Sequence, residues 1–229
     1  MALILNLETS TENCSAALSL DGEVISLKEE SSEQYIHSES LHPFIQEVMS
    51  AAGRKLTDLD AVAVGKGPGS YTGLRIGVSA AKGLAYALNI PLISATGLEM
   101  LALKMTQEND VAEGDLLVPM LDARRMEVYT AIFSHRGNPI SMVEARVIER
   151  GGLDHLAADR VYVFGPGAAK CKEALTREKY VFSGPLYPSA AQLAVLSEER
   201  FRKESFEDLA YFEPFYLKEF IAGTPKPLF

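Results

Sequence analysis

The sequence predicts an α/β protein of two lobes, each a mixed sheet with helices, and three observations support this. Each half of the chain reads in the order strand, strand, strand, helix, strand, helix. Each half also carries a Gly-Pro-Gly corner after a strand, in AVGKGPGSYTGL and in VFGPGAAKCKEAL, which indicates an internal repeat. The 229 residues are enough for two lobes with sizeable cores.

In the first half, the apolar run 2–8 predicts a buried strand. Residues 14–20 and 23–29 flank Asp21-Gly22, a strong hairpin signal because both turn positions favour positive φ. Apolar residues recur at helical spacing over 40–52, with Gly53 as a C-cap and Pro43 near the first turn. A strand at 60–65, a helix at 71–88 and a strand at 91–95 complete this half.

In the second half, strands are expected at 116–121, 127–133 and 140–148, followed by a short helix near 151–158. A strand from 161 then leads through the second corner into a helix that ends near 175. Ser189 is a predicted N-cap for a last helix at about 190–203. We divide the chain into lobes at 1–103 and 104–229, with the last helix and the tail as candidates for packing back on the first lobe.

Composition narrows the possible functions. The net charge of −9 makes this chain alone a poor binder of nucleic acid, so a nucleic-acid role would need a basic partner. Cys14 and Cys171 form neither a disulfide framework nor a CxxC metal site. The start MALILNLETST reads as a strand, and no apolar run approaches the roughly 20 residues of a membrane span. We expect a cytoplasmic protein without membrane association.

The glycine-rich stretch 65–88 has more than one interpretation. Its glycines permit close backbone approach, and amides at a helix start can bind an anion, but Ser70-Tyr71 follow Gly69 where a Walker A loop needs lysine. In the helix, Gly73, Gly77 and Ala81 recur every four residues and form a smooth strip. This strip fits packing on the sheet of its own chain, or packing that also reaches a second chain.

Four segments resemble the TsaB (YeaZ) family: LNLETSTENCSAALSLDGEV, HSESLHPFI, VGKGPGSYTGLRIGVSAAKGLAYALNIPLISATGLEML and LDARRMEVYTAIF. The match is dense in the first half and thinner in the second, where the 165–169 corner and EPFYLKEF continue it. The resemblance implies a degenerate member of the sugar kinase, Hsp70 and actin superfold, ribonuclease H-like in each lobe.

The resemblance also implies a non-catalytic role in synthesis of N6-threonylcarbamoyladenosine (t6A), beside the anticodon of ANN-decoding tRNAs. The expected partners are a catalytic TsaD-type transferase, which uses threonylcarbamoyl-AMP, and a TsaE-type ATPase. Alone, the chain is expected to form a homodimer, and tRNA is expected to bind only through the complex. No cofactor is expected on this chain by itself, although ATP or ADP at the subunit junction stays open.

The metal motif HxxxH of TsaD-type transferases falls on Gly97 and Leu101, which cannot ligate a metal. Glu12 matches one acid of the TsaD-type first-strand pair, but Asn13 replaces the other. We therefore expect no catalytic residues and no metal site. An active small-molecule kinase of the superfold and a metal-dependent glycoprotease stay as alternatives.

We expect the helices at 40–52 and 71–88 to meet the TsaD-type partner. The predicted interface residues are Leu41, Phe44, Ile45, Val48, Met49, Gly73, Leu74, Gly77, Val78 and Ala81. Candidate contacts to a nucleotide at the junction are Glu12, Lys66, Gly67, Gly69 and Arg75. The charged block Asp122–Glu127 has three possible interpretations: a solvated turn, an ion network between the lobes, or a contact with a partner.

Overall fold

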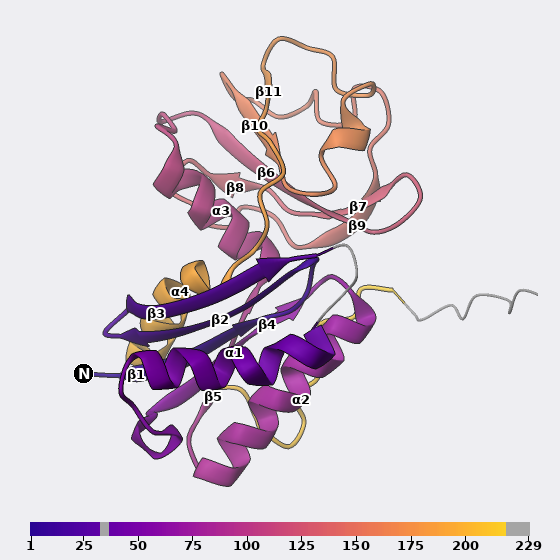
Figure 1. Cartoon of the computed structure of the whole chain (residues 1–229). Helices are drawn as coiled ribbons and strands as arrows, with labels where there is room; N and C mark the ends of the chain where they lie inside the picture. Colours follow the sequence, from indigo (N-terminus) through magenta and orange to yellow (C-terminus); the bar gives the residue numbers. More distant parts are fainter. Residues whose placement is uncertain (33–36, 219–229) are drawn as a thin grey trace, which may run out of the picture.

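The structure is a computed structural model that describes residues 1–32 and 37–218, arranged as two stacked lobes (Figure 1). Elements of the first lobe are β1 (Leu3–Glu8), β2 (Asn13–Leu20), β3 (Glu23–Ser31), α1 (His37–Ala51), η1 (Leu56–Asp58), β4 (Ala61–Gly67), α2 (Tyr71–Leu88) and β5 (Leu92–Thr96). They are followed by α3 (Gly97–Glu108). The first three strands, both long helices and β4 and β5 lie where the sequence predicts them, except that α1 begins before residue 40 and contains Pro43.

The first sheet has the order β3-β2-β1-β4-β5. β1 and β2 pair antiparallel, as do β2 and β3, whereas β4 and β5 continue the sheet in parallel with β1. The hairpin between β2 and β3 turns at Asp21 and Gly22, whose φ values are 53° and 84°. Both values lie in the left-handed region that this turn type requires, so the hairpin prediction is confirmed.

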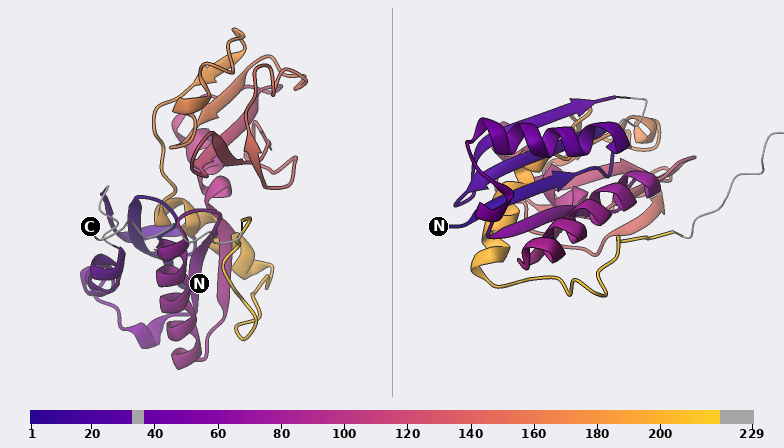
Figure 2. Two further views of the ribbon diagram at one scale, coloured as in Figure 1. Left: turned by 90° about the vertical axis from the view of Figure 1, so that its right-hand side faces the viewer. Right: turned by 60° about the horizontal axis from the view of Figure 1, so that its bottom comes forward.

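Successive side chains of β1 point to opposite faces of this sheet. Leu3, Leu5 and Leu7 pack with the buried sides of α1 and α2, whereas Ile4 packs with Leu193 of α4 (Ala190–Arg202). Figures 1 and 2 show α1 and α2 side by side on one face and α4 on the other. The first sheet is therefore covered by helices on both faces, because each face carries its own apolar set.

The second lobe repeats the strand order. Its elements are β6 (Leu116–Asp122), β7 (Glu127–Thr130), β8 (Phe133–Ser134), β9 (Glu144–Val147), β10 (Val161–Phe164), η2 (Ala169–Cys171) and β11 (Tyr180–Phe182). The strands of the second sheet have the order β11-β10-β6-β7-β9. β6, β10 and β11 are parallel to one another, and β7 pairs antiparallel with both β6 and β9. Read in reverse, this order and these directions are those of the first sheet. The repeat detected in the sequence is a repeat of sheet topology.

Two predicted helices of the second lobe are wrong. Residues 151–158 form turns, and the corner after β10 leads only into the short η2 and further turns up to residue 175. Gly151 adopts φ 73°, a left-handed conformation that ends helical geometry. The predicted strand at 127–133 is divided between β7 and β8, and the strand at 140–148 is limited to Glu144–Val147.

The last helix of each half packs on the sheet of the other half. Leu98, Leu101 and Met105 of α3 belong to a core with β6 and β10, although α3 follows β5. In return, α4 follows the second sheet but contacts the strands of the first. The predicted lobe boundary at 103/104 falls inside α3, and that division stays a prediction.

Candidate functional site

The glycines of the opening corner bring the α2 backbone against the end of β1. The Ser70 amide donates to the Ser10 carbonyl at 2.7 Å, and Thr9 Oγ1 donates to the Gly73 carbonyl at 2.8 Å. A side chain at Gly69 or Gly73 would overlap the Ser10 or Thr9 carbonyl, and one at Gly77 would overlap Thr9 Oγ1. Glycine is required here for contact between two main chains of the same polypeptide.

The ten predicted interface residues are buried within the chain itself, so their assignment to an exposed surface is corrected. All face the first sheet and belong to its cover, and none of their apolar side chains is more than 5% exposed. The helical period correctly identified one face of each helix, but that face meets the sheet of its own lobe.

The exposed sides of the two helices carry other residues. They are Ser38, Glu39, His42, Pro43, Gln46, Glu47, Ser50 and Ala51 on α1, and Thr72, Arg75, Ser79, Gly83, Tyr86 and Ala87 on α2. A side chain at Gly83 would meet no atom within 4 Å, in contrast to Gly77. The outer side of α2 is thus open and built largely from small residues.

The candidate nucleotide contacts point to different neighbours. Tyr187 donates its hydroxyl to Glu12 at 3.1 Å, and Lys66 Nζ lies 3.7 Å from Glu207 of the C-terminal segment. Gly67 adopts φ 102° against Leu74, and Gly69 lies against Ser10. Arg75 is exposed, with its guanidinium 4.3 Å from the centre of the Tyr71 ring. These contacts do not converge on one ligand, so the nucleotide stays a prediction.

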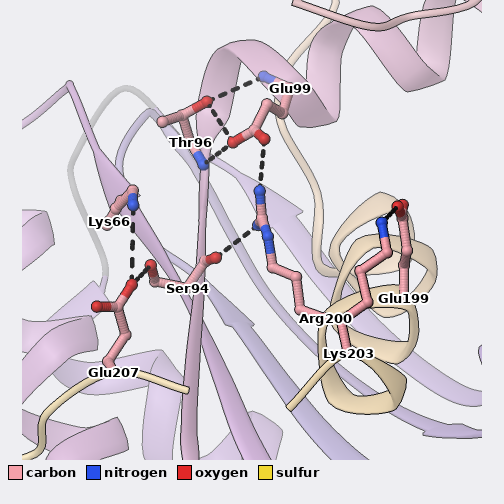
Figure 3. A network of polar contacts seen from close by, with 8 residues as sticks. All are labelled: Lys66, Ser94, Thr96, Glu99, Glu199, Arg200, Lys203 and Glu207. Atoms are coloured by element: carbon pink, nitrogen blue, oxygen red, sulfur yellow. Dashed lines mark hydrogen bonds and ion pairs between the residues drawn. The ribbon is translucent and has the colours of Figure 1, made fainter. Parts of the chain in front are cut away.

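Lys66 also borders a pocket of about 680 Å³ at the carboxyl ends of β4 and β5, which the segment 207–216 covers. The Glu207 amide donates to the Leu92 carbonyl at 2.8 Å, and the Glu207 carboxylate accepts from Ser94 (Figure 3). In the same network, Arg200 of α4 donates to the Ser94 carbonyl and to Glu99, both at 2.5 Å. Polar contacts therefore fasten α4 and the C-terminal segment to β5.

One buried acid was not foreseen. Glu8 ends β1, is fully buried and accepts a hydrogen bond from the Ser10 amide at 2.5 Å, while its second oxygen has no partner within the described residues. Burial raises the pKa of Glu8, because the charged form loses its hydration, and the hydrogen bonds from Ser10 oppose this only in part. A charged residue at the end of a strand predicted to be buried, LILNLE, was the available signal.

The positions aligned with the HxxxH motif lie in the interior. Leu101 is fully buried, and a side chain at Gly97 would lie 3.3 Å from both Leu121 and Pro188 of the second half. His37 is buried with Nε2 2.7 Å from the Thr11 carbonyl, whereas His42 is exposed, so these two histidines of α1 face different ways. Residues 1–32 and 37–218 contain no group of three His, Cys, Asp or Glu side chains that could hold a metal ion.

The two mixed sheets have the same strand order, and the last helix of each half packs on the sheet of the other half. These features define a protein of the actin, Hsp70 and sugar kinase type, so the predicted fold class is confirmed. An N-acetylmannosamine kinase-type protein of Listeria monocytogenes shares this fold at 10% identity, with a TM-score of 0.50 over 89% of this chain and 99% of that one. No helix in the described part of the chain has the length and apolar character of a membrane span.

The family model described as TsaD, tRNA N6-adenosine threonylcarbamoyltransferase, matches residues 29–220, and the chain belongs to this family. It is similar to the tRNA threonylcarbamoyladenosine biosynthesis protein TsaB of Escherichia coli, with 28% identity over 236 residues and 98% of each chain covered. YeaZ from Pseudomonas aeruginosa has a TM-score of 0.83 at 28% identity and covers 95% of this chain and 100% of its own. The resemblance stated from the sequence is confirmed.

Proposed function

We propose that this chain is a non-catalytic subunit required for t6A modification of tRNA. It would bind a catalytic TsaD-type transferase and support transfer of the threonylcarbamoyl group from threonylcarbamoyl-AMP. Similarity to TsaB over 98% of the chain supports this pathway, and so does membership in the family. A cytoplasmic location follows from the same proposal.

The observation that carries the non-catalytic role is the enclosure of positions 97 and 101. The resemblance puts the metal-binding histidines of TsaD-type transferases at these positions, where this chain has glycine and leucine. Gly97 lies against Leu121, Pro188 and Ser10, so the lobes touch where a metal would have to sit. Neither residue offers a donor atom from its side chain, so this chain would contribute surface and stability rather than chemistry.

The partner would dock on the outer side of α1 and α2. These helices lie together on one face of the first lobe, away from α4 (Figure 2). Gly83, Ser79 and Ala87 are small residues that let another helix approach closely, and Tyr86, 80% exposed, offers an apolar anchor beside them. A homodimer through the same face in the absence of the partner, a TsaE-type ATPase, and ATP or ADP at the junction are further parts of this proposal.

The test is reconstitution with the TsaD-type and TsaE-type proteins of the same organism, threonylcarbamoyl-AMP and an unmodified transcript of an ANN-decoding tRNA. Threonylcarbamoylated adenosine, quantified by mass spectrometry, should form only when this chain is present. Full activity without the chain would refute the proposal.

The docking face is tested by Gly83→Leu, with Glu108→Leu on α3 as a control that adds the same side chain at another exposed helix position. Leucine at position 83 would hold a second helix away, so binding of the TsaD-type subunit and modification should both fall at least tenfold. The control should behave like the parent. Equal binding by both variants would move the interface away from α2.

A further inference from the structure

The charged block between β6 and β7 has an unusual backbone. We call residues Asp122–Glu127 the arginine turn. Arg124 and Arg125 adopt φ values of 65° and 49°. The left-handed region is disfavoured for residues with long side chains, and glycine or asparagine would be the ordinary choice at either position. Two adjacent arginines in this conformation indicate that the turn is retained for what its side chains do.

Contacts from three directions hold the arginine turn in place. The Ala123 amide donates to the Glu127 carbonyl at 3.1 Å, and the Arg124 amide donates to Asp122 Oδ1 at 2.9 Å. Lys170, next to the second corner, pairs with Asp122 and donates to the Arg125 carbonyl at 2.9 Å. Lys218 of the C-terminal segment pairs with Glu127. The ion-network interpretation therefore describes the two acids, but not the two arginines.

Arg124 and Arg125 are both exposed, and within residues 1–32 and 37–218 neither guanidinium has an ion-pair partner. Both acids of the turn are already neutralised by lysines. Among the described residues, the turn therefore presents two positive charges that no acid pairs with, on a chain whose net charge is −9. Guanidinium groups bind phosphate oxygens through two parallel hydrogen bonds, which makes two adjacent exposed arginines suited to phosphate groups.

An aromatic platform lies beside the turn. The rings of Tyr216 and Tyr71 have centroids 5.1 Å apart, and the Arg75 guanidinium lies 4.3 Å from the centre of the Tyr71 ring. We call these three residues the aromatic stack. Tyr216 and Lys218 are two residues apart, so their Cα atoms are at most about 7 Å from each other. Since Lys218 contacts the arginine turn directly, the segment 216–218 connects the stack to the turn, and we treat the two together as one surface.

We propose that this surface contacts tRNA, with Arg124 and Arg125 on backbone phosphates and the aromatic stack against an unpaired base. Proteins recognise unpaired RNA by stacking bases on aromatic rings and guanidinium planes, beside cations that follow the backbone. The turn follows the carboxyl end of β6, next to the corner whose Gly167 amide donates to the Met120 carbonyl at 2.9 Å. Ligands collect at such strand ends in open α/β sheets.

This inference rests on the proposed function, because the overall acidity of the chain would prevent binding outside the complex. An acidic protein surface would also attract the two arginines, but it would leave the exposed Tyr216 side chain without a use. RNA engages both parts of the surface, and for that reason we argue for RNA and leave a protein contact as an outcome of the test.

The experiment uses the complex of this chain with the TsaD-type subunit. Arg124 and Arg125 are replaced together by asparagine, which tolerates positive φ and so preserves the turn while removing the charge. The control replaces Arg54 and Arg150, two exposed arginines outside this surface, by asparagine and changes the net charge equally. The dissociation constant for an unmodified transcript of an ANN-decoding tRNA is measured over a series of salt concentrations.

Loss of two phosphate contacts should raise the dissociation constant about tenfold near physiological salt. It should also lower the slope of log affinity against log salt by about 1.4, at about 0.7 per contact on single-stranded RNA. Replacement of both arginines by lysine should restore most of the slope, and Tyr216→Ala should weaken binding with the slope unchanged. The Arg54 and Arg150 control should match the parent.

Parental affinity and slope in the asparagine variant, with a normal complex, would overturn this inference and leave the proposed function intact. An asparagine variant that no longer binds the TsaD-type subunit would also overturn it, because the turn would then be a protein contact. If the parent chain itself formed no complex, the proposed function would fail and this inference with it.

Discussion

The two lobes share one sheet topology but differ in what covers the sheets. In the first lobe, α1 and α2 cover one face with 15 and 18 residues of helix, and α4 covers the other. In the second lobe, α3 covers one face, but the opposite face is covered by irregular chain, turns and the short η2, which supply Ile148, Leu153, Cys171 and Leu175. The same strand order is thus compatible with very different amounts of helix.

This difference separates the requirements of a sheet from those of a helix. Strand order follows from hairpins and crossovers, which both halves retain. Both corners also donate a backbone hydrogen bond near the end of the first strand of their own lobe: the Ser70 amide to the Ser10 carbonyl, and the Gly167 amide to the Met120 carbonyl. A long helix needs a sustained apolar face and end signals. α2 has both, with Ser70 as N-cap and Asn89 in the left-handed conformation as C-cap. The segment after the second corner has neither.

The largest expected effect is at the close contact between α2 and β1. Gly77→Leu would force α2 away from Thr9, and overpacking of this kind costs roughly 3 kcal/mol. For a chain of this size that corresponds to a fall in Tm of roughly 10 °C. Gly83→Leu, six residues on in the same helix, should leave Tm unchanged or raise it slightly, since glycine within a helix costs about 1 kcal/mol. Equal Tm values for the two variants would show that the glycines do not differ in role.

A second comparison uses an ion pair that joins the two halves and an ion pair within the second half. Arg200 and Glu99 are only 23% and 21% exposed in their side chains, and Arg200 also donates to the Ser94 carbonyl (Figure 3). Arg200→Ala should cost about 2 kcal/mol, measured by urea denaturation, because Glu99 loses its cationic partner but keeps hydrogen bonds from the Thr96 amide and hydroxyl, both at 2.8 Å. Arg160 is 46% exposed, but its partner Asp115 is only 1% exposed and would keep a single hydrogen bond, from the Ala112 amide at 3.0 Å. Arg160→Ala should therefore cost at least as much as Arg200→Ala, and a clearly smaller cost would contradict this account.

The smallest effect is a pH dependence at the end of β1. Because the pKa of Glu8 is raised above 4.5 by burial, its contribution to stability is complete below pH 4.5 and is lost as pH rises through the folded-state pKa. Glu8→Gln keeps the shape and removes the titration. The Tm of Glu8→Gln minus the Tm of the parent should therefore increase by a few degrees when the pH is raised from about 4 to about 8. A difference that stays constant over this range would show that Glu8 is not the titrating group, and Glu113→Gln at an exposed position serves as the control.

Much of the fold could be predicted because its signals are local. The Asp21-Gly22 hairpin, α2 and the Ser189 N-cap of α4, whose hydroxyl accepts from the Ala191 amide, each depend on residues close together in the sequence. The candidate site could be predicted only in part. Periodicity identified one face of α1 and of α2, but an apolar face has the same spacing whether it meets its own sheet or another chain.

The sequence by itself determined the two-lobed repeat, the family and the corners, since a turn residue or a helix period acts over only a few positions. The tertiary structure alone decided which side of α2 stays open, that Glu8 is buried, and that Lys218 meets Glu127 across 91 positions of sequence. The physical reason is that burial and ion pairing depend on which distant segments arrive at the same place. No local pattern in the chain specifies that meeting point.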